Sequence, residues 1–175
     1  MNKYFKVLIL FIVVAITSYF IVIFITPAAV MLAVKAKATS TLNVPVYSNV
    51  ITHKDRHVVL PNPDFLYVVC GYNVWNGSLK ISGKMPENSY YSFSLYSGNT
   101  LNYYIKNDRN TPEKEFELIL THEDCLAANN PQPIECVTSP TYMGVMMVRI
   151  LIDKPENLEK LKEIQRSFKV EKFKE

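Results

Sequence analysis

The sequence predicts a mainly β protein with a β-sandwich or jelly-roll-like domain, one C-terminal amphipathic helix and an N-terminal transmembrane helix. Three observations lead to this class. Residues 7–25 are almost entirely apolar, residues 89–96 alternate between two faces, and apolar side chains recur every three to four positions over 155–168. These patterns are typical of a membrane span, a half-buried strand and an amphipathic helix, respectively.

The apolar stretch lies between Val7 and Ile25, where 15 of 19 residues are Val, Ile, Leu or Phe and none is charged. The hydrocarbon core of a bilayer is about 30 Å thick and needs roughly 20 such residues in a helix. A cleaved secretory signal has an apolar stretch of only about 7–15 residues, so we expect an uncleaved anchor in the lipid bilayer. Pro27 lacks an amide hydrogen and clashes with the preceding turn, so we expect it to end or kink the helix.

Residues 1–37 are expected to form the membrane anchor and its flanks, and residues 38–175 a single β-rich extracytoplasmic domain. The second segment is long enough for one hydrophobic core and too short for two ordinary ones. It contains 15 basic and 16 acidic residues, a net charge of −1. Nucleic acid is therefore not an expected partner, because its binding requires a concentrated basic surface.

Charges on the two sides of the apolar stretch are nearly balanced, so the positive-inside rule decides little here. The tail before the stretch is too short to fold, whereas a long following segment can be translocated despite its charges. We therefore expect a single-pass membrane protein with its body outside the cytoplasm.

Strands are predicted near 65–74, 78–83, 89–97, 101–106, 116–120 and 144–152. Asn76 and Gly77 favour a type I′ turn, in which both central residues have positive φ, so a hairpin is expected between the first two strands. The last strand is nearly all apolar and should be buried on both faces. Arg149 within it then needs a polar partner or a route to water.

A helix is predicted near 155–168. Asp153 offers an N-cap, Pro155 a preset φ in the first turn and Glu156 the carboxylate of a capping box. The apolar stripe expected to face the sheet consists of Leu158, Leu161, Ile164 and Phe168. The end of the chain, residues 169–175, alternates Lys and Glu and is expected to be a solvated tail.

The three cysteines divide into a candidate pair and a single thiol. Cys125 and Cys136 enclose a loop rich in Asn and Pro. A disulfide between them would close a loop of roughly a dozen residues, worth about 3 kcal/mol in the chain-entropy model. Such a bond fits an oxidising compartment, and the alternative is two free thiols. Cys70 lies in an apolar run and is expected to be a buried small hydrophobic residue.

Residues 61–67, with the sequence PNPDFLY, resemble the Pro-Asn-x-Asp-x-Leu-Tyr segment of the large bacterial family called domain of unknown function 1254. The likeness continues through residues 77–96 and resumes at 147–168, where a strand bearing Arg149 leads into a helix containing Gln165. Short membrane-anchored members share the pattern Asp-Phe-x-x-x-Val-Cys-x-Tyr found at 64–72. The resemblance implies a β-rich envelope domain, with the bacterial inner membrane as the membrane that holds the anchor, and no established reaction.

Five polar side chains are candidates for binding a ligand: Asn62, Asp64, Tyr67, Tyr91 and Arg149. Asn62 and Asp64 flank Pro63 and could hold a ligand hydroxyl or a cation. The alternative is a plain Asx turn at the entry to the strand, since Asn and Asp bond their own backbone in such turns.

Tyrosines 90, 96, 103 and 104 leave a similar choice. They could form an aromatic surface for a sugar or lipid headgroup. More often such tyrosines fill a β-sandwich, with the hydroxyl at its edge.

Motifs of known chemistry are missing from the sequence. It has no Gly-x-Ser-x-Gly segment, no phosphate-binding glycine loop and no Cys-x-x-Cys pair, so we predict no catalytic residue and no cofactor. His53 and His57 lie four apart in a strand-like segment, about 13 Å from each other, so no metal site is predicted.

These observations favour a membrane-tethered envelope protein with a non-catalytic binding or accessory role, partnered by another envelope protein or a glycan. The alternative is an extracytoplasmic enzyme acting on a glycan or lipid. Convergence of Asp64, a tyrosine hydroxyl and Arg149 or Arg109 in one deep pocket would favour the enzyme.

Overall fold

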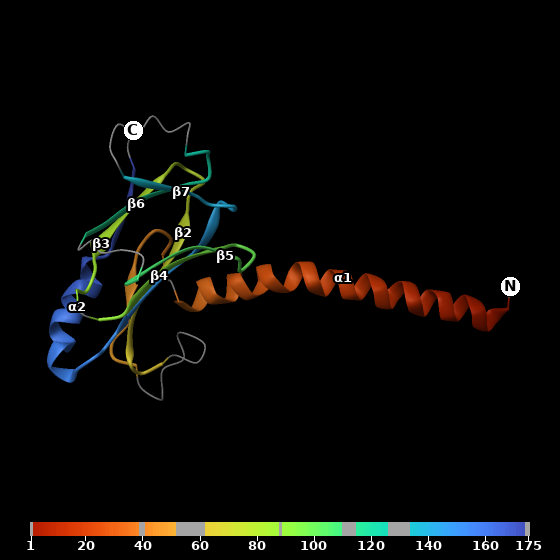
Figure 1. The fold of residues 1–175 in the computed structure, drawn as a ribbon. Coiled ribbons are helices and arrows are strands. Elements are labelled where there is room, and N and C mark those ends of the chain that lie inside the picture. Colours follow the sequence, from red (N-terminus) through yellow and green to blue (C-terminus); the bar gives the residue numbers. More distant parts are fainter. Residues whose placement is uncertain are drawn as a thin grey trace.

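A long N-terminal helix leads into two β-sheets that pack face to face in the computed structural model of the chain (Figure 1). The structure describes residues 2–38, 41–51, 62–87, 89–109, 115–125 and 134–173. The helices are α1 (Lys3–Ala38), the 3-10 turn η1 (Pro155–Asn157) and α2 (Leu158–Ser167). The strands are β1 (Val46–Tyr47), β2 (Phe65–Asn73), β3 (Leu79–Lys84), β4 (Tyr91–Ser97), β5 (Asn102–Asn107), β6 (Glu115–Thr121), β7 (Glu135–Thr138), β8 (Met143–Leu151) and β9 (Lys169–Lys172).

One sheet has five strands in the order β1-β2-β8-β4-β5, and the other has four in the order β7-β6-β3-β9. All neighbouring pairs are antiparallel except β6 and β7, which are parallel. The longest pairing joins β2 to β8 from Phe65 opposite Leu151 to Asn73 opposite Met143. β8 is the middle strand of the five-stranded sheet, and these two strands carry Tyr67 and Arg149, two of the five candidate binding residues.

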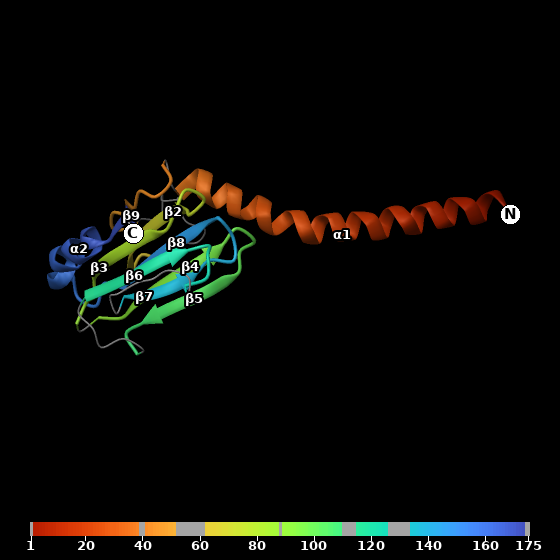
Figure 2. The ribbon, with the colours of Figure 1, turned by 90° about the horizontal axis from the view of Figure 1, so that it is seen from above.

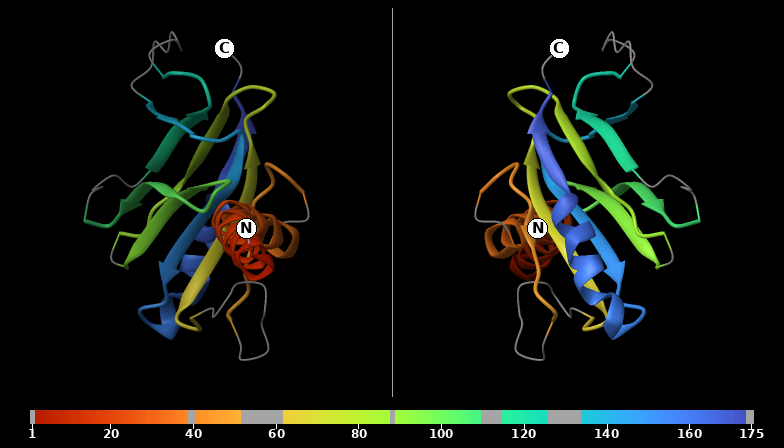
Figure 3. Two further views of the ribbon diagram at one scale, coloured as in Figure 1. Left: turned by 90° about the vertical axis from the view of Figure 1, so that its right-hand side faces the viewer. Right: turned by 90° about the vertical axis from the view of Figure 1, so that its left-hand side faces the viewer.

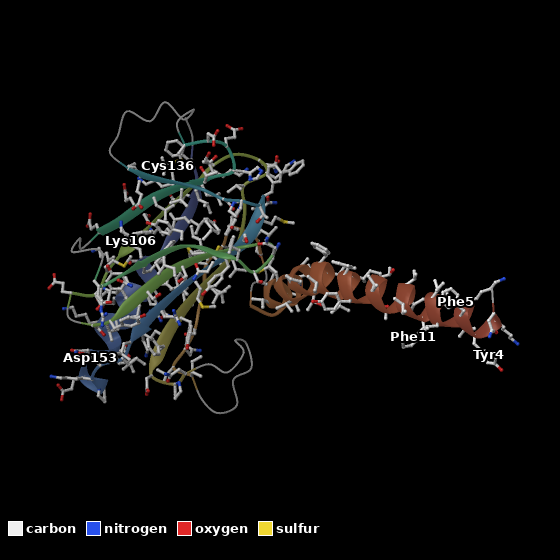
Figure 4. The ribbon with its side chains drawn as sticks, turned by 45° about the vertical axis from the view of Figure 1, so that its right-hand side comes forward. Tyr4, Phe5, Phe11, Lys106, Cys136 and Asp153 are labelled. Carbon is white, nitrogen blue, oxygen red and sulfur yellow. A yellow bond between two sulfur atoms is a disulfide. The ribbon has the colours of Figure 1, made fainter. Side chains whose placement is uncertain are left out.

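The hydrophobic core lies between the two sheets. The five-stranded sheet contributes alternate residues of its central strands, and the four-stranded sheet contributes those of β3 and β6. Its largest fully buried side chains are Tyr72, Tyr91, Phe93, Phe116 and Phe168. At the open edge, Lys106 of β5 forms an ion pair of 2.8 Å with Glu135 of β7, which connects the two sheets (Figure 4).

The predicted fold class is confirmed, and each predicted strand is present within a few residues of its expected position. The alternation over 89–96 has the expected consequence, since Tyr91, Phe93 and Leu95 all enter the core between the sheets. The nearly apolar segment 144–152 is the central strand β8, with both faces largely covered. Three short strands, β1, β7 and β9, were not predicted.

The hairpin expected at Asn76 and Gly77 is wrong. Gly77 has a positive φ of 114°, but Asn76 is not among the positive-φ residues, so the turn is not type I′. The strands on its two sides, β2 and β3, belong to different sheets. The turn therefore carries the chain from one layer of the sandwich to the other, a choice that the local sequence does not encode.

The C-terminal helix begins differently from the prediction. Residues 155–157 form a 3-10 turn before α2, and neither helix start has a side-chain cap. The Asp153 carboxylate instead accepts hydrogen bonds from the Asn157 side-chain amide at 3.0 and 3.1 Å. The tail expected to be solvated forms β9 against β3.

The stripe of α2 does face the sheets as expected, with Leu161 buried and Leu158 and Ile164 packed against the core. Figure 2 shows α2 alongside β3 at the end of the body opposite to α1. Phe168 follows the last turn of the helix in an extended conformation and is completely buried.

The N-terminal helix continues through Pro27 as far as Ala38, so the expectation that Pro27 ends it is wrong. Its first part is exposed, with Tyr4, Phe5 and Phe11 projecting away from every other element (Figure 4). Near its end, Met31 and Val34 pack on β2 and β8, on the face of the five-stranded sheet that points away from the core. Figure 3 looks along α1 and shows the helix in front of these strands.

Cys70 is a completely buried free cysteine in the middle of β2, as expected. Burial raises the pKa of its thiol from 9.0 to about 12. The Cys70 thiol therefore ionises at a lower pH in the unfolded chain than in the folded chain. Stability is lost as the pH rises from the lower of these two pKa values towards the higher.

We predict that Cys70→Ala flattens this alkaline loss of stability, although it lowers stability at neutral pH by leaving a small void. Urea unfolding midpoints between pH 8 and pH 10.5 measure the effect. Burial also raises the pKa of Tyr72 and Tyr103, so the variant removes only part of the slope. Parallel pH profiles for variant and parent would contradict the prediction.

Candidate functional site

The outer face of the five-stranded sheet brings together polar side chains from its three central strands. Tyr67 of β2 lies opposite Arg149 of β8, and Arg149 lies opposite Ser92 of β4. Directly opposed residues of antiparallel strands point to the same face, so the three side chains form one row across the sheet. This row is called the Arg149 row below.

Arg149 is the charged centre of the row. Its Nη2 donates a hydrogen bond of 3.3 Å to the Ser92 hydroxyl, and the side chain is half-buried. Within the described part of the chain it forms no ion pair with a carboxylate. A guanidinium presents five donors in a fixed planar fork. Several of those donors therefore remain for an acidic group that approaches the outer face.

A second polar group lies one row further along the same face. Ser94 of β4 is opposite Met147 of β8 and is only 2% exposed. Among the residues that the structure describes, its hydroxyl has no hydrogen-bond partner. Burying a hydroxyl without a partner costs about 1–3 kcal/mol.

Aromatic side chains border the Arg149 row on its other side. The rings of Phe65 and Tyr90 meet edge to face with centroids 6.1 Å apart, and the rings of Phe65 and Tyr67 are 6.3 Å apart. Tyr90 is 38% exposed and Phe65 is half-buried. The outer face thus combines a cation with an accessible apolar border.

Asn62 and Asp64 form an Asx turn at the entry to β2. The Asn62 side-chain oxygen accepts a hydrogen bond from the Asp64 amide at 2.9 Å, and the Asn62 amide donates to the Tyr67 hydroxyl at 3.1 Å. The Asp64 carbonyl accepts a hydrogen bond from the amide of Ile152. These contacts connect the turn to the Arg149 row and orient Tyr67.

Tyr91 lies apart from the other four candidates. It pairs with Ile150 of β8, one position from Arg149, and its ring is in the core between the sheets. The four tyrosines considered as one aromatic surface are also divided. Tyr103 and Tyr104 pack against the main core, and Tyr96 packs on the outer face.

The Tyr91 ring is thus on the opposite face of the sheet from Arg149, so these two candidates do not line one cleft. His53 and His57 lie outside the described residues. Among those that are described, no group of three His, Cys, Asp or Glu side chains has the arrangement of a metal site.

A shallow groove beside α2 was not predicted. It is lined by charged side chains of both signs, among them Lys84, Glu87, Glu115, Lys160 and Glu163. These positions come from three separate segments of the chain, so no local pattern could have identified the groove.

Gln165 holds the edge of the site in place. Its side-chain amide is 2% exposed and donates to the carbonyl oxygens of Ser48 and Tyr67 at 2.9 and 2.7 Å. The Ser48 hydroxyl in turn accepts a hydrogen bond from the Tyr67 amide at 2.8 Å. Gln165 was noted only through the family resemblance, because the packing of α2 against β2 is not visible in the local sequence.

We predict that Gln165→Glu destabilises the protein more than Gln165→Leu. Both variants lose the two hydrogen bonds, at about 1 kcal/mol each. The glutamate in addition places a buried carboxylate against two carbonyl oxygens, so it must either remain charged without donors or take up a proton. Thermal unfolding at pH 7 should give the highest melting temperature for the parent, a lower one for Gln165→Leu and the lowest for Gln165→Glu. Acidification to pH 5 should narrow the difference in melting temperature between the two variants, because it favours the protonated glutamate. A difference that stays unchanged would count against this explanation.

Cys125 and Cys136 form a disulfide in the structure, with Cα atoms 5.8 Å apart. The bond links the segment that follows β6 to β7, the strand that runs parallel to β6. Most of the loop between the two cysteines lies outside the described residues. Figure 4 shows Cys136 at the end of the body furthest from Asp153.

Comparisons with known proteins identify the family and the fold of the chain. The model of a family described as "Protein of unknown function (DUF1254)" matches residues 42–172. No curated protein gives a significant match.

Two solved structures have similar folds. The VPA0106 protein of Vibrio parahaemolyticus is 13% identical with a TM-score of 0.66, over 85% of this chain and 34% of that one. An uncharacterised protein of Burkholderia cenocepacia is 14% identical with a TM-score of 0.50, over 86% of this chain and 40% of that one. The chain spans about a third of the length of the first of these proteins. Likeness at this identity concerns the fold alone.

Proposed function

The chain belongs to the DUF1254 family of proteins of unknown function, and from this premise we propose that it is a membrane-tethered, extracytoplasmic binding domain without catalytic activity. On this proposal residues 1–37 hold it in the bacterial inner membrane as a single-pass protein. Residues 38–175 then form the domain that meets an envelope protein or a glycan.

The observation that carries the proposal is the course of α1. The helix is long and apolar enough to cross a membrane, and none of its most apolar window is buried against the rest of the chain. Exposed Val, Ile, Leu and Phe side chains over several turns are unfavourable in water and favourable in lipid. The same helix then packs through Met31 and Val34 on the sheet. A tether and a docking element are thereby combined in one uninterrupted helix.

Two features support the remaining parts of the proposal. The disulfide between Cys125 and Cys136 fits an oxidising space outside the cytoplasm. The Arg149 row offers unused donors beside the accessible ring of Tyr90, which suits an acidic group on the partner. Charge-assisted hydrogen bonds of this type are stronger than neutral ones.

Membrane extraction tests the tether. The full-length chain should remain in the pellet after carbonate washing, without loss of the N-terminal residues. A matched variant carrying Val13→Lys and Phe20→Lys should be released, because each lysine at mid-span costs about 2.5–3.5 kcal/mol on insertion. Recovery of the parent as a soluble chain that begins near Thr39 would show a cleaved signal instead.

Non-reducing mass mapping of protein taken directly from cells tests the compartment. It should link Cys125 to Cys136 and leave Cys70 as a thiol. Three free thiols would contradict an extracytoplasmic body. A bridge involving Cys70 would be inconsistent with its place in the core.

Photocrosslinking in cells tests the binding role. A benzophenone amino acid in place of Tyr90 should give one dominant adduct, and Arg149→Gln should reduce it strongly while Arg149→Lys retains part of it. The same probe in place of Lys160, which is exposed on α2, serves as the control position. An adduct that is insensitive to Arg149→Gln would remove the Arg149 row from the proposal.

A further inference from the structure

Four large apolar side chains are exposed together at one end of the body. Trp75 is 67% exposed, Leu101 54%, Tyr142 43% and Met143 44%. Trp75 and Tyr142 are in ring contact, with centroids 4.5 Å apart. This set is called the aromatic edge below. The Tyr142 ring also contacts the ring of His122, with centroids 3.9 Å apart.

The members of the aromatic edge come from three segments held together by hydrogen bonds. The Tyr142 carbonyl accepts from the Val74 amide at 2.9 Å, next to Trp75. The Thr141 hydroxyl accepts from the Gly98 amide and donates to the Met143 carbonyl, both at 2.8 Å, which joins the β4–β5 turn to the start of β8. The position of these side chains is therefore determined by the sandwich and not by a free loop.

The aromatic edge lies on the side of the body from which α1 extends. Figures 1 and 2 both show the β4–β5 turn and the start of β8 on that side, beside the last turns of the helix. Lys35 of α1 reaches Met143 directly, with its Nζ 3.4 Å from the sulfur atom. A plane drawn across α1 just beyond the body would thus meet this edge.

The helix leaves almost no space between a membrane and the body. Met31, the first residue that packs on the sheet, follows Ile25 by six positions, or about 9 Å along a helix. The polar interface of a bilayer adds about 5–8 Å beyond the hydrocarbon core on each side. If residues 7–25 span the core, the body begins at the outer limit of that interface.

We propose that the aromatic edge rests on the lipid headgroups of the membrane that α1 spans, a contact that depends on the tether proposed above. Trp and Tyr are enriched at membrane interfaces, where an apolar ring and a polar N–H or O–H are both accommodated. Lys35 lies beside the edge and matches the anionic lipids of such a surface. A second contact of this kind would prevent the body from tilting about α1 and direct the Arg149 row sideways, parallel to the membrane.

The lipid surface is the occupant that the geometry favours over a protein partner. The edge is continuous with α1 through Lys35 and Met143, and α1 brings it to the membrane without a spacer. A protein partner at the same place would have to enter the narrow space between the body and the headgroups.

Trp75 is the only tryptophan of the chain, so its fluorescence reports on the edge alone. The full-length protein is reconstituted into phosphatidylethanolamine–phosphatidylglycerol vesicles that carry a nitroxide either on the headgroup or deep in the acyl chain. The headgroup nitroxide should quench Trp75 about twofold more strongly than the deep one, as expected for a ring at the interface. The control is W75Y combined with K160W, which moves the probe to α2 at the far end of the body and should be quenched by neither.

Flotation of the vesicles separates the two proposals. Protein that floats, with Trp75 unquenched by either nitroxide, overturns the lipid contact and leaves the tether intact. Trp75 shielded from aqueous acrylamide but unquenched by lipid nitroxides would show that protein covers the edge, which also overturns the lipid contact. Protein that fails to float overturns the tether, and the lipid contact with it.

Discussion

Replacing Gly144 with alanine is expected to cost about 3 kcal/mol of stability, among the largest effects of any single substitution in the chain. Gly144 is in β8, opposite Tyr72 of β2 and Ser97 of β4. A Cβ at this position would overlap the carbonyl oxygen of Tyr96 and the hydroxyl of Tyr72. The first of these atoms is backbone of β4, which pairs with β8 and β5, so it cannot move without disturbing strand pairing.

The Tyr72 hydroxyl is equally constrained. It hydrogen-bonds with the Tyr103 hydroxyl at 2.9 Å and the Ser139 hydroxyl at 3.0 Å, and it donates to the Tyr96 carbonyl at 3.1 Å. Any shift of the ring away from residue 144 would break this buried network. An unsatisfied buried hydroxyl adds about 1–3 kcal/mol to the cost of the overlap.

Chemical unfolding of the detergent-solubilised full chain measures the effect of Gly144→Ala. Gly77→Ala is the matched control, because Gly77 has a positive φ but nothing within 4 Å of its missing Cβ. It should lose only about 1 kcal/mol, from backbone strain alone. Adding Tyr72→Phe to Gly144→Ala should recover a part of the loss, since the Tyr96 carbonyl still obstructs the Cβ. Equal losses at Gly144 and Gly77 would contradict the steric explanation.

Truncation of Phe168 to alanine is expected to cost about 3–5 kcal/mol, because it removes a ring that has no exposure to solvent. The ring lies over Gly83 of β3, where a Cβ would come within 2.6 to 2.8 Å of its carbon atoms. The main chain of Phe168 is held separately, since its carbonyl accepts a hydrogen bond from the Tyr47 hydroxyl at 2.7 Å. The truncation therefore creates a cavity without releasing the backbone.

A double-mutant cycle with Gly83→Ala tests this packing. In the parent, Gly83→Ala should destabilise, because the buried ring has little room to move away from the new methyl group. In the Phe168→Ala background the same change should be nearly neutral or stabilising, because the methyl group enters the cavity. The two costs should thus be strongly non-additive. Additive costs would show that the ring does not limit residue 83.

Several parts of this protein followed from local sequence patterns. The membrane-length helix, the strands, the amphipathic stripe and the buried Cys70 depend on periodicity and hydrophobicity, which act within a few neighbouring residues. The candidate site was partly accessible in the same way, since an arginine in an apolar strand implies a polar partner. That partner proved to be Ser92.

Other features depend on contacts between segments that are far apart in the sequence, so only the tertiary structure reveals them. The turn at Gly77 joins strands of two sheets because β2 pairs with β8, whose residues are at least 70 positions away, and not with β3. Tyr91 and Arg149 are on opposite faces of one sheet because their strands pair in a register that no local pattern specifies. Gln165 contacts backbone atoms about 100 residues distant in sequence. Strand order and register are determined by the total burial of the assembled sandwich, so they become visible only when all of its segments are in place.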